Sequence, residues 1–203
     1  MITLILISIT AVVSFIAFQS PSLVDKLEFN AARIIHGNQY YRLISHAFIH
    51  AGWTHLLVNM MVLYFFGSAV ESFFKTSFGL KSEFFFLLLY FGGIIASNLY
   101  ALYQHKDNYH YNAIGASGAV SAVLFTFILY NPWEKLYFFG LFPIPGILFG
   151  VGYLIYSWYM GKRASDNVAH DAHFLGALFG LIFPVVLKPA LFSHFLDQLL
   201  QVM

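Results

Sequence analysis

The chain has no cysteine among its 203 residues. Disulfides, thiol nucleophiles and cysteine metal ligands are therefore excluded, although this absence does not fix the cellular compartment. Charged residues are also scarce, at 9% of the sequence, whereas about 25% is usual in soluble domains. The net charge of +1 offers no basic stripe of the kind that binds nucleic acid. The composition thus excludes an ordinary soluble domain and gives no indication of a nucleic-acid partner.

Apolar sequence is what the chain has in abundance, with 60% hydrophobic and 20% aromatic residues. Several nearly uncharged runs approach the roughly 20 residues that a bilayer-spanning helix needs. The first run lacks the basic start and small-residue cleavage site of a signal peptide, so we interpret it as a helix. The predicted spans are residues 2–18, 53–70, 84–102, 117–130, 146–160 and 168–187. The expected fold is an all-α integral membrane protein, a bundle of six transmembrane helices.

The segments between and after these spans also have an expected structure. Residues 21–52 form a long connection whose spaced apolar positions favour short helices in the membrane interface. Charged residues mark a short polar connection at 71–83, and two prolines make 133–145 a partly embedded loop. The tail alternates an apolar face with a polar face that bears His194, Asp197, Gln198 and Gln201. We therefore expect a membrane domain at 1–190 and an amphipathic interfacial helix at 191–203.

A single hydroxyl, that of Ser117, stands at the start of the fourth apolar run. It follows a polar loop and is flanked by Gly115 and Gly118. Glycines on both sides let the backbone and a partner helix approach closely and leave the serine unshielded. In an isolated occurrence, such small residues are usually a packing surface.

Histidines at the start of two other spans give that serine its interest. His55 and Asn59 lie one turn apart on one face of the second span. His173 lies one turn before Gly176 in the sixth span, and Gly176 with Gly180 permits close contact with a neighbouring helix. Polar groups within membrane helices are costly and usually mark function. Three helices thus place polar groups at one depth near the same membrane face.

These residue types are those of acyl transfer by a serine nucleophile. Ser117 needs a base to take its proton, and His173 is the natural base near neutral pH. The oxyanion of the tetrahedral intermediate needs hydrogen-bond donors, which His55, the Asn59 amide and the Ser117 backbone N–H can supply. Asp171 lies two residues from His173 and hence on a different helix face, so no orienting role is expected for it.

On these residues, the chain resembles the rhomboid intramembrane serine proteases over nearly its whole length, from Asn30 through the sixth span. The matching motifs are Tyr41-Arg42, His46-x-x-x-His50-x-x-x-x-His55-x-x-x-Asn59, Gly67-Ser68-Ala69-Val70-Glu71, Gly-Ala-Ser-Gly at 115–118 and Ala172-His173-x-x-Gly176. Three ordered motifs on three helices make the match specific.

The resemblance implies a Ser117–His173 dyad with His55 and Asn59 completing an oxyanion hole. It also implies that residues 21–52 are half-embedded, that the fifth span is a lateral gate, and that no cofactor or metal is needed. Substrates would be single-span membrane proteins cut in or beside their transmembrane helix. The six-span form suggests a prokaryotic member in the bacterial inner membrane, with its active site toward the outside. The distribution of lysine and arginine does not set this orientation, and the sequence leaves the oligomeric state open.

Two positions depart from the family pattern. Tyr41 stands in place of a tryptophan, which keeps an interfacial aromatic residue. Some members have a tyrosine one turn after the nucleophile that packs on the catalytic histidine, whereas this chain has Ser121. Whatever holds the His173 ring must therefore come from elsewhere.

Two other functions stay open. A metal-dependent membrane hydrolase would use His46, His50, His55, His170 and His173, although no HExxH motif accompanies them. A non-catalytic relative would bind membrane helices, but such a protein would be expected to lack the serine or the histidine. We expect His46 and His50 to be structural, with His50 able to line the cavity, and His170 and Asp171 to cap the sixth span.

Overall fold

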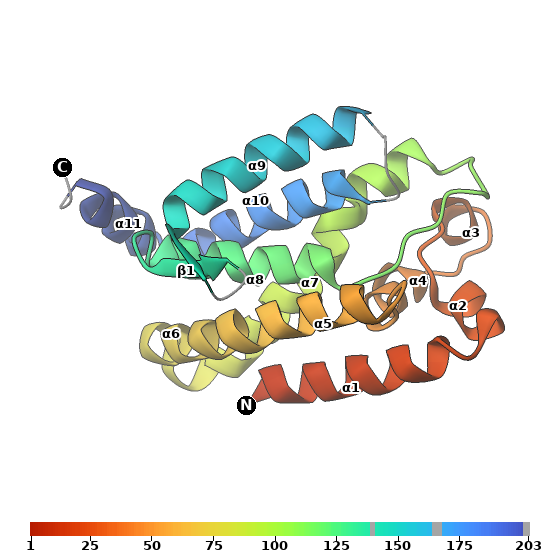
Figure 1. Cartoon of the computed structure of the whole chain (residues 1–203), viewed down its shortest axis with the longest axis horizontal. Helices are drawn as coiled ribbons and strands as arrows, with labels where there is room; N and C mark the ends of the chain where they lie inside the picture. The colour runs from red at the N-terminus through yellow and green to blue at the C-terminus, as the bar shows by residue number, and fades with distance from the viewer. Residues whose placement is uncertain (139–140, 164–167, 201–203) are drawn as a thin grey trace.

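Helices make up most of the chain, as the long uncharged runs predict (Figure 1). The computed structural model describes residues 1–138, 141–163 and 168–200. Its long helices are α1 (Ile2–Ala17), α5 (Trp53–Val62), α6 (Ser68–Phe78), α7 (Ser82–Gln104), α8 (Ser117–Tyr130), α9 (Gly146–Arg163), α10 (His170–Leu187) and α11 (Ala190–Leu200). Its shorter helices are α2 (Pro21–Leu27), α3 (Ala31–Ile35), α4 (Arg42–Ser45), η1 (His46–Phe48), η2 (Leu63–Gly67) and η3 (Gly79–Lys81).

Helix α8 is the centre of the bundle. Every residue of this helix after Ser117 is buried, which its uninterrupted apolar sequence allows because it has no polar face to present outward. Helices α7 and α10 pack directly on it, and in Figure 1 the order from top to bottom is α9, α10, α8, α5 and α1. The core therefore forms around the helix that starts with the candidate nucleophile.

Small residues set the distance between α8 and α10. A Cβ atom at Gly176 would collide with the carbonyl oxygen of Gly118, and one at Gly180 would collide with that of Ala122. Between these backbones, the Thr126 hydroxyl donates a hydrogen bond of 2.8 Å to the Gly180 carbonyl. Close approach of this kind is what small residues at four-residue spacing permit in membrane helices. The contact predicted for the sixth span is present, and its partner is the fourth.

The long connection has internal structure, as its spaced apolar positions predict. Ser20 and Asn30 cap α2 and α3 through side-chain oxygens that accept backbone N–H groups. The buried Arg42 donates to the carbonyls of Asp25 and Glu28 at 2.7 and 2.8 Å, which joins α4 to the end of α2. The segment is thus a folded unit that its own hydrogen bonds hold together.

The second span continues further than predicted. A π-helical turn, η2, joins α5 to α6, and the helix runs to Phe78, so residues 71–78 are helical and not a polar connection. Glu71 belongs to the helix because its Oε1 atom accepts the backbone N–H of Thr3 at 2.5 Å, at the start of α1. The charge therefore caps a neighbouring helix and does not mark a loop.

The all-α expectation is wrong in the connection between α8 and α9. Strands β1 (Lys135–Phe138) and β2 (Phe142–Pro145) pair in antiparallel register, with Lys135 opposite Pro145. Both strands of a two-stranded hairpin are edges, where prolines are tolerated.

Two predictions near the C-terminus are tested in part. Helix α10 begins at His170, and its N-cap residue Ala169 makes no side-chain cap, so the capping roles of His170 and Asp171 are wrong. Both residues lie inside the first turn. Helix α11 matches the predicted tail helix, although residues 201–203, and residues 164–167 of the predicted polar turn, lie outside the described ones.

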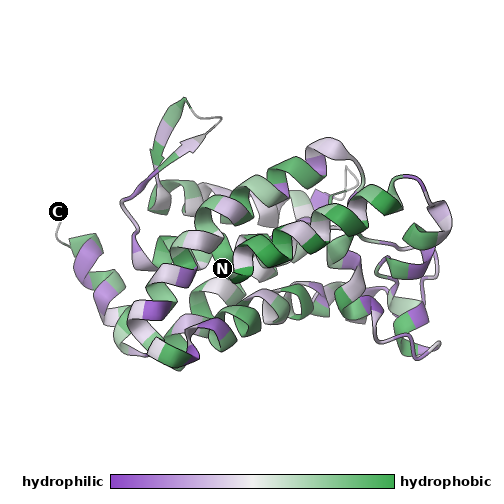
Figure 2. Cartoon of the chain, turned by 90° about the horizontal axis from the view of Figure 1, so that it is seen from below, coloured by the Kyte–Doolittle hydropathy of each residue, from purple (hydrophilic) through white to green (hydrophobic). Residues whose placement is uncertain are grey.

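Apolar side chains cover much of the outer surface. Large hydrophobic residues of α1, α5 and α9 are exposed, and Figure 2 shows hydrophilic residues to be more frequent at the two ends of the bundle than along its middle. Among the described residues, two helical stretches are long and apolar enough to cross a membrane: Trp53–Gln104, which includes α5 to α7, and His170–Leu187. Helices α1 and α8 are apolar but shorter.

Candidate active site

The turn before Ser117 requires a glycine. Gly115 has a φ of +117°, a conformation that side-chain-bearing residues rarely adopt. The chain leading to this turn is paired with the long connection through an isolated bridge between Phe29 and Ala113. Ser117 is partly exposed, whereas the rest of α8 is buried. The structure therefore presents this hydroxyl at the open end of the central helix.

His55 packs against the turn that precedes Ser117. A Cβ atom on Gly115 would lie 2.6 Å from His55 Cε1, so any larger residue at position 115 would collide with the ring. Asn59, one turn further along α5, is buried, and its Nδ2 donates to the His55 carbonyl at 2.9 Å. An asparagine amide has two N–H groups, so this bond uses one of its two donors. The structure thus brings His55 to the start of α8, with Asn59 one turn further along α5.

His173 comes to the same end of the bundle through the contact of α8 with α10. A Cβ on Gly118 would lie 3.6 Å from the Ala172 carbonyl oxygen, so the backbones beside Ser117 and His173 are neighbours. Gly176, one turn after His173, packs against Gly118 as described above. His173 is partly exposed, like Ser117. Residues from three distant parts of the sequence thus meet around the N-terminus of α8.

Tyr153 of α9 contacts the His173 ring, for which the sequence identified no supporting residue. Its ring stacks on the His173 ring with 6.2 Å between centroids and 22° between planes. Its hydroxyl lies 2.6 Å from the Ser121 hydroxyl, one turn after Ser117. Ser121 signalled that the ring support must come from another element, but no pattern in the sequence singled out Tyr153 among 13 tyrosines.

His50 holds the residue before Ser117. Its Nε2 accepts the backbone N–H of Ala116 at 3.4 Å, so the neutral ring carries its proton on Nδ1. That Nδ1–H donates to the Ser14 hydroxyl at 2.9 Å, and this hydroxyl donates to the Phe48 carbonyl at 3.0 Å. Burial, and secondly the nearby His55, lower the pKa of His50 to about 3. A neutral His50 is therefore part of the support of the α8 N-terminus.

His46 has a similar structural position. It is buried, its Nε2 lies 3.4 Å from the Asn98 amide nitrogen, and its carbonyl accepts the Gly115 N–H at 2.9 Å. Burial lowers the pKa of His46 to about 4. The expectation that His46 and His50 are structural agrees with these contacts.

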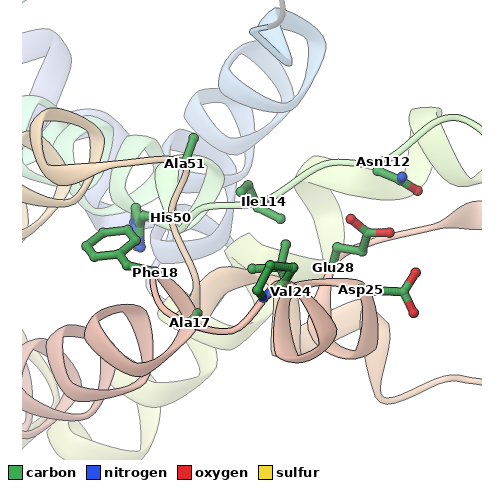
Figure 3. A pocket seen from close by; sticks show the side chains of 10 residues that line it. Ala17, Phe18, Val24, Asp25, Glu28, His50, Ala51, Asn112 and Ile114 are labelled. Carbon is green, nitrogen blue, oxygen red and sulfur yellow. The ribbon is translucent and has the colours of Figure 1, made fainter.

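A cavity of about 500 Å³ lies on the other side of His50 (Figure 3). Its lining residues come from the end of α1, from α2 and from the loops that lead to α5 and α8: Ala17, Phe18, Pro21, Val24, Asp25, Glu28, His50, Ala51, Asn112 and Ile114. None of the four candidate site residues lines it. His50 thus lines a cavity that adjoins the candidate site, and its place in a cavity that also contains Ser117 stays a prediction.

The histidines do not gather as metal ligands do. In the described ranges 1–138, 141–163 and 168–200, no three His, Cys, Asp or Glu side chains come together with the geometry of a metal site. His50 uses both ring nitrogens in hydrogen bonds within the protein. The arrangement therefore resembles a hydrogen-bonded support around a serine more than a ligand set.

Comparison with known proteins gives a consistent result. A family model described as Rhomboid domain matches residues 37–190. RHOMBOID-like protein 12, mitochondrial, of Arabidopsis thaliana is 28% identical over 68% of this chain and 43% of its own length. Presenilin-associated rhomboid-like protein A, mitochondrial, of Danio rerio is 30% identical over 68% of this chain and 35% of its own. Rhomboid protein 1, mitochondrial, of Saccharomyces cerevisiae is 30% identical over 70% of this chain and 40% of its own.

The chain spans less than half the length of these curated relatives. The matched region includes the candidate residues of α5, α8 and α10.

Proposed function

We propose that this chain, which belongs to the rhomboid family, is an intramembrane serine protease with a Ser117–His173 dyad. Its substrates are single-span membrane proteins, cut in or next to their transmembrane segment. The observation that supports this most is the close packing of α8 against α10, because it makes the backbones next to Ser117 and His173 neighbours.

The proposed reaction is a two-step acyl transfer. Ser117 Oγ attacks the carbonyl carbon of the scissile bond while its proton passes to His173. The C–N bond breaks, and the leaving amine takes that proton from His173. A water molecule then attacks the acyl-enzyme ester by the same route, which releases the new carboxyl end and restores the serine. No metal or cofactor takes part in these steps.

The oxyanion of each tetrahedral intermediate needs donors that are already in place. We assign this role to His55, to the second N–H of the Asn59 amide and to the Ser117 backbone N–H. The contact of His55 with Gly115 supports the assignment, since it brings this ring to the turn that presents the serine. The N–H of Ser117 at the start of a helix also lies at the positive end of the helix dipole.

The length of α8 supports a site below the membrane surface. A helix of 14 residues rises about 21 Å at roughly 1.5 Å per residue. The hydrocarbon core of a bilayer is about 30 Å thick. If the C-terminal end of α8 lies near one surface, Ser117 lies several ångströms below the other, where water reaches it only through an opening in the bundle.

The membrane arrangement is part of the same proposal. Residues 1–190 form six spans with the 21–52 connection half-embedded, and α11 lies along the membrane surface. The site opens toward the outside of a bacterial cell membrane. The chain has no cysteine, so cysteines introduced at loop positions and labelled from each side of the membrane would test the span count and the orientation. An N-terminus and a C-terminus on different sides of the membrane would contradict six spans.

A serine-directed covalent probe gives the decisive test. Wild-type protein in detergent micelles should be labelled at Ser117 and should cleave a single-span reporter protein. Ser117→Ala should abolish both labelling and cleavage, and His173→Ala should abolish both while leaving the fold intact. Cleavage that persists in Ser117→Ala would rule out this nucleophile.

The same experiment separates the other two functions. A metal-dependent hydrolase would lose activity with a chelator and keep it in Ser117→Ala. A non-catalytic binder would retain the reporter without cutting it and would leave the probe unreacted. The placement of His46 and His50 in separate internal hydrogen bonds favours the serine mechanism over the metal one.

A further inference from the structure

The ring of Tyr153 touches both helices of the proposed dyad. It stacks on His173 of α10, with 6.2 Å between centroids, and its hydroxyl is bonded to Ser121 of α8 at 2.6 Å. Ser121 lies one turn after Ser117, so it shares the serine's face of α8. Tyr153 itself comes from a third helix, α9. One side chain therefore joins the helix of the nucleophile to the ring of the base.

The orientation of Tyr153 is well defined by its own neighbours. Phe149, one turn earlier in α9, stacks on it at 5.9 Å and 29°, and Phe125 of α8 lies 5.5 Å away at 51°. With two aromatic contacts and a hydroxyl bond, the tyrosine ring has little freedom to turn. A fixed, nearly parallel ring then restricts rotation of the imidazole about its side-chain torsion.

A general base must hold one ring nitrogen within hydrogen-bond reach of the nucleophile. The His170 ring lies nearly perpendicular to the His173 ring, with 5.9 Å between centroids, and the Tyr156 ring lies nearly perpendicular to the His170 ring at 5.4 Å. The Tyr153 ring, in contrast, is nearly parallel to the His173 ring. A nearly parallel neighbour restricts the plane of the imidazole and hence where its nitrogens point.

We propose that Tyr153, anchored by Ser121, is a positioning residue that sets the ring plane of His173 for catalysis. The proposal rests on the proposed function, because it assigns His173 as the base. It also makes the orientation of the His173 ring depend on the position of α9. This helix is peripheral, since it buries only Gly146, Gly150 and Ser157 among its described residues. The nucleophile has no such dependence, because α8 is enclosed.

The test compares variants of Tyr153 with a matched control in the same helix. Tyr153→Leu should lower kcat for reporter cleavage about tenfold to hundredfold, the usual consequence of a small misplacement, with KM within about twofold of wild type. Tyr153→Phe keeps the stacked ring and should retain much more activity than Tyr153→Leu. Tyr156→Leu, one turn away and in ring contact with His170, should leave kcat unchanged.

A hydroxyl pair provides a second measurement that does not depend on Tyr153→Leu folding. Tyr153→Phe and Ser121→Ala each remove one end of the same hydrogen bond, so each should lower kcat by a similar factor of about two to five. The double variant should lose no more than either single variant, because the two changes remove one interaction. Additive losses, or none in either variant, would contradict the anchor.

A position swap sharpens the result. Ser121→Tyr combined with Tyr153→Ser returns the ring from α8 at nearly constant volume and should recover kcat above that of Tyr153→Leu. Wild-type kcat in a folded Tyr153→Leu variant, an equal loss in Tyr156→Leu, or a change confined to KM would overturn the proposal. Failure of the proposed function would look different: the probe would then leave wild-type Ser117 unlabelled.

Discussion

Helices α8 and α9 are both apolar, both pack on α10, and both contribute to the candidate site, yet they are placed very differently. Of the 14 residues of α8, only Ser117 is not buried, whereas the 18-residue α9 buries three of those described. The difference comes from side-chain size at the contact, since α8 meets α10 through small residues and α9 through rings. Small residues at the contact with α10 thus accompany the buried helix, and rings accompany the peripheral one.

The largest loss of cleavage is expected from substitutions in α8 and α10, the two helices that pack closely. Ser117→Ala, His173→Ala and the double variant should each lower cleavage on the order of 10⁴-fold or more, because residues that act as a unit lose their contribution together. Single-turnover cleavage of a membrane reporter measures this. Additive losses would mean that the two residues do not work as a pair. The comparison of α8, which holds the nucleophile, with α9, which supports the base, would then not apply to catalysis.

A smaller loss is expected from the second span. Asn59→Ala should reduce kcat by about 10²–10³, the cost of removing one oxyanion donor, while Asn59→Asp should be no better because it has no N–H to offer. Since the amide also donates to the His55 carbonyl, the thermal midpoint must be measured in parallel. A loss of stability without a loss of kcat would assign Asn59 to the fold alone.

Glycines give a direct comparison of α8's surroundings with α9's. Gly180→Ala places a methyl group against the Ala122 carbonyl and should cost about 1–3 kcal/mol of unfolding free energy, as overpacking usually does. Gly152→Ala in α9 meets nothing within 4 Å and should be neutral or stabilise by up to about 1 kcal/mol. Thermal unfolding in detergent measures both. Equal effects would show that α9 is packed as tightly as α8.

The smallest effect concerns pH and the support of α8. The pKa of His50 is lowered to about 3 and that of His46 to about 4, below the value of about 6.5 expected in the unfolded chain. The free energy of unfolding that depends on these two histidines is fully present above pH 6.5. It is lost as the pH falls toward their pKa values in the folded protein, because only the unfolded state takes up the protons. By pH 5.5 this amounts to a loss of roughly 1 kcal/mol for each histidine.

Unfolding measured between pH 7.5 and 5.5 should show this decline. His50→Gln, whose amide does not titrate, should have a flatter dependence than wild type. If the unfolding free energy of that variant depends on pH as steeply as in wild type, His50 titrates equally in the folded and the unfolded protein.

The helices and the candidate residues were accessible to sequence reasoning because local patterns encode them. The pair His55 and Asn59 has helical spacing, and Gly176 with Gly180 predicted a close helix contact that the structure contains. Tyr153 was not accessible, because its role depends on which helix lies beside α10, and nothing local specifies that. Ser121 gave the one hint, as the absence of a ring where a ring was expected.

The errors have a common physical origin. The sequence predicts a connection at Glu71, because charge in apolar sequence usually marks one, but its carboxylate accepts the N–H of Thr3, which lies 68 residues away in the chain. Pro143 and Pro145 predict a loop, but they belong to a strand whose outer edge needs no donor. In each case a partner distant in sequence satisfies a group that looks unfavourable locally.

Arg42 has a consequence for how the protein responds to its surroundings. Its guanidinium gathers oxygen atoms of three residues, Asp25, Glu28 and Gln39, at 2.6–2.8 Å. A guanidinium keeps its charge at every pH a cell encounters. The hydrogen bonds that join α4 to the end of α2 therefore keep their charged donor when the pH falls, whereas the stability that His46 and His50 contribute declines.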